Sequence, residues 1–87
     1  MFTKLHSTLI SREIPLRKYD LWKLSDNMYQ IEETVWNKTA SAAIPLGFYT
    51  CAEKAIFNYW VYAEIDIPFM TLYTELTGNT LVGSHWI

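Results

Sequence analysis

The fold is decided by residues 41–65, which read SAAIPLGFYTCAEKAIFNYWVYAEI and join a strand pattern to the clearest helix pattern in the chain. Thr50 and Glu53 have the spacing of a capping box, in which each side chain bonds the other residue's backbone N–H. We therefore predict a main helix over residues 51–65 with Thr50 as its N-cap. Its apolar residues share one broad face: Ala55, Ile56, Tyr59, Trp60, Tyr62 and Ala63.

The residues before this helix are typical of strands. Residues 28–36 are rich in Tyr, Ile, Thr, Val and Trp and alternate with a period of two. Residues 41–49 return beside them, and Pro45 predicts an edge position or a bulge because proline cannot donate to a sheet ladder. Weaker patterns at residues 5–10 and 19–24 add further strands. We expect a small antiparallel sheet of three to four strands.

A second, short helix is predicted over about residues 67–77. Pro68 suits a first helical turn, apolar residues follow at helical spacing, and Gly78 suits the left-handed position just past the end. A strand is the alternative prediction for this segment, because threonine favours strands and the segment contains Thr71, Thr74 and Thr77. The predicted fold class is α+β, with residues 1–87 forming a single domain.

The composition is unusually aromatic for so short a chain. Fourteen of the 87 residues are Trp, Tyr or Phe, and 51% are hydrophobic. A domain of this size buries only about 60% of the surface that its unfolded chain exposes. Some aromatic surface is therefore predicted to contact another protein, a second copy or a ligand.

Charge is distributed unevenly along the chain. The first 24 residues carry five basic and two acidic side chains, whereas residues 25–87 carry two basic and seven acidic ones. The net charge of -2 argues against a nucleic-acid partner held by phosphate contacts. The acidic part predicts either a solvated surface or a face that docks on a basic patch of a partner.

No residue pattern nominates an enzyme, a cofactor or a metal site. Cys51 is the only cysteine, and His6 and His85 are the only histidines, without metal-ligand spacing. Glu32 and Glu33 are adjacent on a strand, so they point to opposite faces and form no carboxylate pair. The chain shows no signal-peptide pattern and no apolar run long enough for a membrane span, which predicts a cytoplasmic protein.

The junction LGFYTCAEKA, residues 46–55, resembles the third-strand-to-helix junction of plant AP2-type DNA-binding domains. In that family a three-stranded sheet reads the major groove with Arg and Trp side chains. The strands here lack those arginines, since residues 28–49 contain only Lys38 as a basic residue. A weak nucleic-acid-binding sheet domain therefore stays an alternative function.

The favoured function is non-catalytic binding of another protein, because aromatic-rich, charge-poor surfaces make binding hot spots. The chain resembles, as a class, small accessory proteins of bacteriophages and mobile elements that bind and inhibit a host protein or a nucleic-acid-handling defence complex. A homodimer, and an oligomer that sequesters a nucleotide or metabolite, are the alternatives. The predicted partner-binding residues are Glu32, Glu33, Trp36, Phe57, Val61, Glu64 and Trp86. Phe57, Val61 and Ile65 form a strip that is either exposed or covered by the C-terminal segment.

Overall fold

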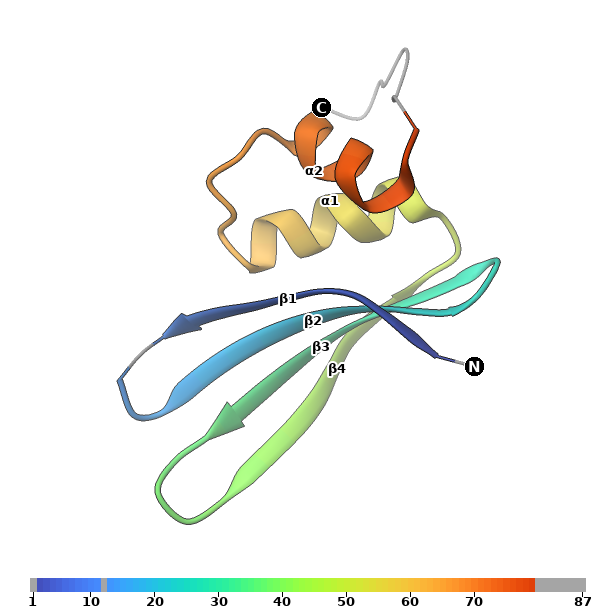
Figure 1. Ribbon diagram of the computed structural model, residues 1–87. Coiled ribbons are helices and arrows are strands. Elements are labelled where there is room, and N and C mark those ends of the chain that lie inside the picture. The colour runs from blue at the N-terminus through green and yellow to red at the C-terminus, as the bar shows by residue number, and fades with distance from the viewer. Residues whose placement is uncertain (1, 12, 80–87) are drawn as a thin grey trace.

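The computed structural model describes residues 2–11 and 13–79 as a sheet of four strands with two helices on one of its faces (Figure 1). The strands are β1 (Thr3–Ser11), β2 (Leu16–Ser25), β3 (Met28–Trp36) and β4 (Ser41–Tyr49). They pair antiparallel in sequence order, β1-β2-β3-β4. The helices are α1 (Ala52–Tyr62) and α2 (Phe69–Thr77). The predicted α+β class is confirmed, and the strand alternative for the second helix is wrong.

Each outer strand of the sheet contains a β-bulge. In β4, Gly47 pairs with Ile31 and Pro45 with Glu32, so Leu46 is the extra residue between them. Proline is tolerated here because β4 is an edge strand, as the sequence predicted. In β1, the register shifts twice: between Lys4 and His6, which leaves Leu5 as an extra residue, and between Leu9 and Ser11, which leaves Ile10 as another. A bulge reverses the alternation of side chains across it, which decides what each sheet face carries.

The first helix forms where it was predicted, but its ends differ. Cys51 is the N-cap, with extended φ and ψ of -125° and 127°, and no side chain caps the helix. The predicted capping box with Thr50 as N-cap is therefore wrong. The reason is that β4 pairs with β3 as far as Tyr49 and Cys51 is still extended, so the first helical residue is Ala52.

The last turn of α1 ends three residues before the predicted end. Glu64 has a left-handed φ of 51°, which takes the chain off the helix axis. The Ile65 N–H still donates to the carbonyl of Trp60 at 3.3 Å. The Trp60 indole Nε1–H donates to the carbonyl of Ile67 at 2.7 Å. These two bonds hold the connection to α2 against the end of α1.

The second helix begins at Phe69, two residues after the predicted start at about residue 67, because Pro68 is its N-cap with ψ 146°. Gly78 ends it in the left-handed conformation, φ 75°, with its N–H on the carbonyl of Thr74. This confirms the role predicted for Gly78. Neither helix of the described residues is long and apolar enough to cross a membrane.

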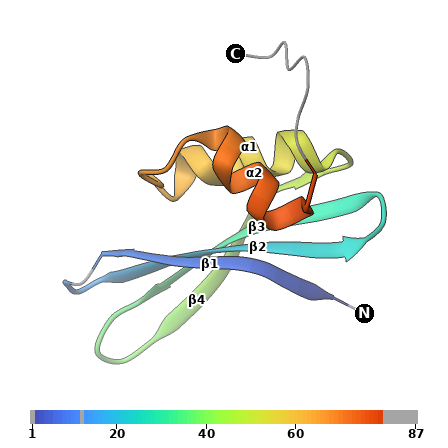
Figure 2. The ribbon, with the colours of Figure 1, turned by 45° about the horizontal axis from the view of Figure 1, so that its top comes forward.

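The core lies between the sheet and α1, and α2 packs on α1 from outside (Figures 1 and 2). Phe69 of α2 contacts the rings of Phe57 and Trp60, with centroids 5.4 and 6.1 Å apart. The buried apolar residues are Tyr19, Leu21, Tyr29, Ile31, Ala55, Ile56, Tyr59, Ala63, Phe69 and Leu72. Both helices lie on the same side of the sheet, so the described residues leave the other side uncovered.

Candidate functional site

Strand register assigns the residues of the uncovered side. Tyr19, Leu21, Tyr29 and Ile31 are buried beneath α1, so the residues alternating with them point away from the helices. We call this side the aromatic face. Its large apolar members are Leu9, Leu16, Trp22, Met28, Trp36 and Phe48.

The aromatic face carries large apolar side chains where an uncovered sheet face is normally polar. Phe48 is 59% exposed and Leu9 is 48% exposed, and the other four large apolar members are half-buried. Aromatic side chains and methionine are enriched where proteins contact one another. Phe48 reaches this face because of the β4 bulge: it pairs with Gln30, whereas Ile44, four residues earlier, pairs with Glu33 on the helix side.

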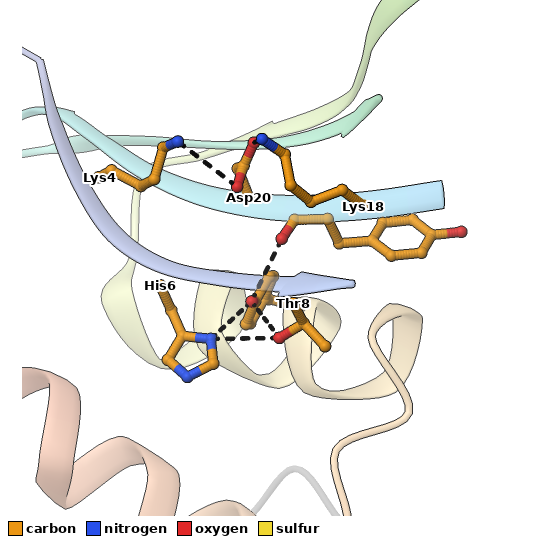
Figure 3. A network of polar contacts seen from close by, with 7 residues as sticks. Lys4, His6, Thr8, Lys18 and Asp20 are labelled. Atoms are coloured by element: carbon orange, nitrogen blue, oxygen red, sulfur yellow. Dashed lines mark hydrogen bonds and ion pairs between the residues drawn. The ribbon is translucent and has the colours of Figure 1, made fainter. Parts of the chain in front are cut away.

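A charged group occupies the middle of the aromatic face. Asp20 is only 2% exposed, and its Oδ1 and Oδ2 lie 3.7 Å from the ammonium groups of Lys4 and Lys18 respectively (Figure 3). Lys4 also lies over the ring of Trp22, 5.0 Å from its centroid. Oδ1 is buried and has no hydrogen-bond donor within the described part of the chain. Glu32 lies directly opposite Asp20 on β3.

On the helix side, a polar network joins β1 to α1. The Tyr59 hydroxyl lies 2.7 Å from His6 Nδ1 and 2.8 Å from Thr8 Oγ1, and it donates to the carbonyl of Tyr19 at 3.4 Å (Figure 3). Burial raises the pKa of Tyr59 to about 12. His6 is thus engaged with Tyr59, and His85 lies outside the described residues. Among residues 2–11 and 13–79, no group of three His, Cys, Asp or Glu side chains could hold a metal ion.

Glu32 and Glu33 lie on opposite faces of β3, as the sequence indicated. Glu33 points to the helix side and accepts a hydrogen bond from the Tyr19 hydroxyl at 2.6 Å. Burial, and then the neighbouring Glu33 carboxylate, raise the pKa of Tyr19. Glu33 is therefore occupied inside the fold, whereas Glu32 belongs to the aromatic face.

The other predicted partner-binding residues do not lie together. Phe57 packs against Trp60 and Phe69, so α2 covers this part of the predicted strip. Val61 is 54% exposed on α1, and Glu64 is exposed in the connection after it. Trp36 ends β3 and lines a shallow hollow of about 360 Å³ at the β3–β4 hairpin. Trp86 lies outside the described residues.

A second hollow, of about 260 Å³, lies on the helix side where α1 begins. Leu5, Tyr29, Ile56, Tyr73 and Leu76 form its apolar walls, with Lys23 beside them. Cys51, the residue before α1, is exposed.

Sequence reasoning missed the centre of the aromatic face. Trp22 was the available signal, since Lys18, Asp20 and Trp22 alternate with the apolar side of the predicted strand at residues 19–24. Lys4 gave no signal, because only the bulge at Leu5 places it on the same face as Asp20. A search of protein families, of curated proteins and of solved structures finds no match to this chain.

Proposed function

We propose that this chain is a non-catalytic protein-binding module that docks another protein on its aromatic face. One observation carries the proposal: the sheet face that no described residue covers holds two exposed apolar side chains, Leu9 and Phe48, and two tryptophans. Contacts rich in Trp and other aromatic residues supply most of the binding energy of protein interfaces.

The charges of the face support a protein rather than a nucleic acid as the occupant. Lys4 and Lys18 are both directed at Asp20, and Glu32 adds a second carboxylate beside it. A phosphate backbone needs an excess of cations, which this face does not have. Arginines are the residues with which the AP2-type domains read bases, and the arginine of β2, Arg17, pairs with Val35 on the helix side and not on this face.

The specific form of the proposal is a cytoplasmic inhibitor, encoded by a phage or mobile element, that covers a working surface of a host protein. Small size, net acidity and the exposed aromatic face support this form. Occupying a surface needs no catalytic group, and carboxylates such as Glu32 suit a basic host surface built for nucleic acid.

The test compares exposed apolar residues on the two sides of the molecule. Tagged wild-type protein is used to capture a partner from lysate, and the affinity of the purified partner is then measured for each variant. Phe48→Ser should weaken binding about thirtyfold, since a central aromatic contact contributes about 2 kcal/mol. Val61→Ser is the matched control, because Val61 is similarly exposed but lies on α1; it should leave the affinity unchanged.

The opposite pattern, with binding lost in Val61→Ser and kept in Phe48→Ser, would move the site to the helix side and refute the proposal. Sedimentation of the wild-type protein shows whether two copies of the chain form a dimer. A dimer that Phe48→Ser dissociates would mean that the face binds this chain itself, which would also overturn the proposal.

The second candidate function is sequestration of a small ligand, favoured by the 260 Å³ hollow at the start of α1. A ligand that binds only the folded state raises the melting temperature, and the rise continues with the logarithm of the ligand concentration above Kd. A nucleotide and metabolite library should then give a concentration-dependent thermal shift that Leu76→Trp, which fills the hollow, abolishes. No shift with any compound would eliminate this candidate.

A further inference from the structure

We propose that the centre of the aromatic face accepts an arginine side chain of the partner, with its guanidinium group between Asp20 and Glu32. The inference rests on the proposed function and adds the chemistry of one contact. It starts from Asp20, a buried carboxylate on a sheet face that the described residues leave uncovered.

Asp20 has two positively charged groups nearby, but neither donates a hydrogen bond to it. Both lysine nitrogens stand 3.7 Å from its oxygens, which is too long for a hydrogen bond. Oδ1 accepts no hydrogen bond from any described residue. Buried polar atoms in folded proteins nearly always have a hydrogen-bond partner, so the missing donor is the feature that needs explaining.

Glu32 makes the need for a donor stronger. Its side chain is half-buried, and no hydrogen bond or ion pair joins it to another described residue. Directly opposed residues on neighbouring strands have Cβ atoms about 5 Å apart, so the two carboxylates are close neighbours. Like charges at this spacing destabilise the pair unless a cation lies between them. One cation inserted here would serve both groups.

A guanidinium fits this place better than an ammonium group. It presents five N–H donors in a rigid plane and can bond two carboxylates at once, whereas an ammonium is a compact point charge. Two ammonium groups are already present and leave Oδ1 unsatisfied. The ring of Trp22 already has one cation over it, so this face is also suited to the stacking that guanidinium groups favour.

The lysine side chains leave a route to the buried carboxylate. The side chains of Lys4 and Lys18 are 40% and 33% exposed, so either ammonium group can swing into solvent when a partner arrives. The guanidinium group of the partner then replaces a long lysine–Asp20 ion pair by short, charge-assisted hydrogen bonds. The two lysines thus neutralise Asp20 in the free protein, until the partner's arginine binds.

The test titrates the full chain with Nα-acetylarginine amide and follows the side-chain carboxyl ¹³C signals of Asp20 and Glu32 by NMR. The arginine derivative should give saturable shifts at both carboxyls. The lysine derivative should bind about fivefold more weakly, and the uncharged citrulline derivative should give no saturable shift. Non-saturable shifts of equal size with all three compounds, or no shifts at all, would overturn the inference.

Variants at Glu32 separate the site from general charge effects. Glu32→Gln keeps the shape of the side chain and avoids disturbing the buried Asp20, and it should weaken arginine binding about fivefold. Glu75→Gln, on the exposed side of α2, is the control and should bind as the wild type does. Equal weakening by both variants would overturn the inference.

The outcome can be told apart from failure of the proposed function. If Phe48→Ser still abolishes partner binding while arginine gives no shift, the arginine contact is wrong and the docking face stands. If arginine saturates Asp20 and Glu32 while Phe48→Ser leaves partner binding intact, the docking face is wrong and the guanidinium site stands.

Discussion

Replacing Tyr59 with Phe removes one oxygen from the contact between β1 and α1 and should cost about 2 kcal/mol of stability at pH 7. The Tyr59 hydroxyl has close partners in His6 and Thr8, at 2.7 and 2.8 Å, and each bond contributes about 0.5–1.5 kcal/mol. The bond to the Tyr19 carbonyl is 3.4 Å long and adds little. His6 and Thr8 lie 3.3 Å apart and can bond one another in the variant, which keeps the loss below the maximum.

The same hydroxyl makes the effect depend on pH. The pKa of Tyr59 is raised from 10.0 to about 12 in the folded protein. Below pH 10 both states hold the proton, so the full stabilisation is present. Between pH 10 and 12 the unfolded chain releases this proton and the folded protein keeps it, so stability falls as the pH rises. At pH 11 about 1.4 kcal/mol of the wild-type advantage is lost.

Urea unfolding followed by tryptophan fluorescence, at pH 7 and pH 11, measures both effects. Wild type and Tyr59→Phe should differ by about 2 kcal/mol at pH 7 and by about 0.6 kcal/mol at pH 11, because the variant lacks the titrating group. Other titrations at pH 11 affect both proteins and cancel in the difference. Tyr62→Phe is the control: Tyr62 is 41% exposed, and its loss should change stability by less than about 0.5 kcal/mol. A Tyr59→Phe loss no larger than this, or a difference that stays constant between the two pH values, would refute the reasoning.

Two further predictions concern the end of α2 and the pair on the helix side of the sheet. Gly78→Ala should lower the free energy of unfolding by about 1 kcal/mol in thermal denaturation, because φ at this position is 75° and a Cβ there meets nothing within 4 Å, so only backbone strain acts. Gly78→Asn should cost less, and an equal cost for both would point to something other than backbone conformation. Glu33→Gln should lower the pKa of Tyr19, because the carboxylate that accepts its hydroxyl proton loses its charge; a titration of the Tyr19 Cζ signal by NMR measures this. An unchanged Tyr19 pKa would mean that burial alone raises it.

The strands of the β3–β4 hairpin could be predicted from the sequence because their signal is local. Residues 28–36 and 41–49 were predicted with the bounds that β3 and β4 have. Alternation and β-branched content depend on each segment alone. The start of α1 depends on more, since Thr50 fits a capping box by type, but Cys51 after it is still extended where the chain leaves the pairing of Tyr49 with Tyr29. That pairing is a tertiary fact, and it overrides the local preference.

The sequence predicted the candidate site only at those positions where the alternation of side chains along a strand fixes the face of the sheet. Glu32 and Glu33 were predicted to point to opposite faces of their strand, and Glu32 lies on the aromatic face together with Trp36. Asp20 was missed because its burial depends on the partners of β2, not on the residues around it. The strip of Phe57 and Val61 was divided by α2, whose Phe69 packs against Phe57. A sequence pattern gives the side of an element that is apolar, but the neighbour that covers it depends on the fold.

The bulges at Leu5 and Leu46 explain why the aromatic face has its composition. Without the extra residue at Leu5, strand alternation would place Lys4 with His6 on the helix side, away from Asp20. Without the extra residue at Leu46, Phe48 would share the side of Ile44, and the face would lose its most exposed ring. Bulges interrupt the ladder and frequently redirect side chains next to functional sites. One bulge in each outer strand, at Leu5 in β1 and at Leu46 in β4, places a residue of the proposed docking surface. The irregular positions of this sheet thus serve the face that the helices leave uncovered, which is the arrangement expected if that face is the one that binds.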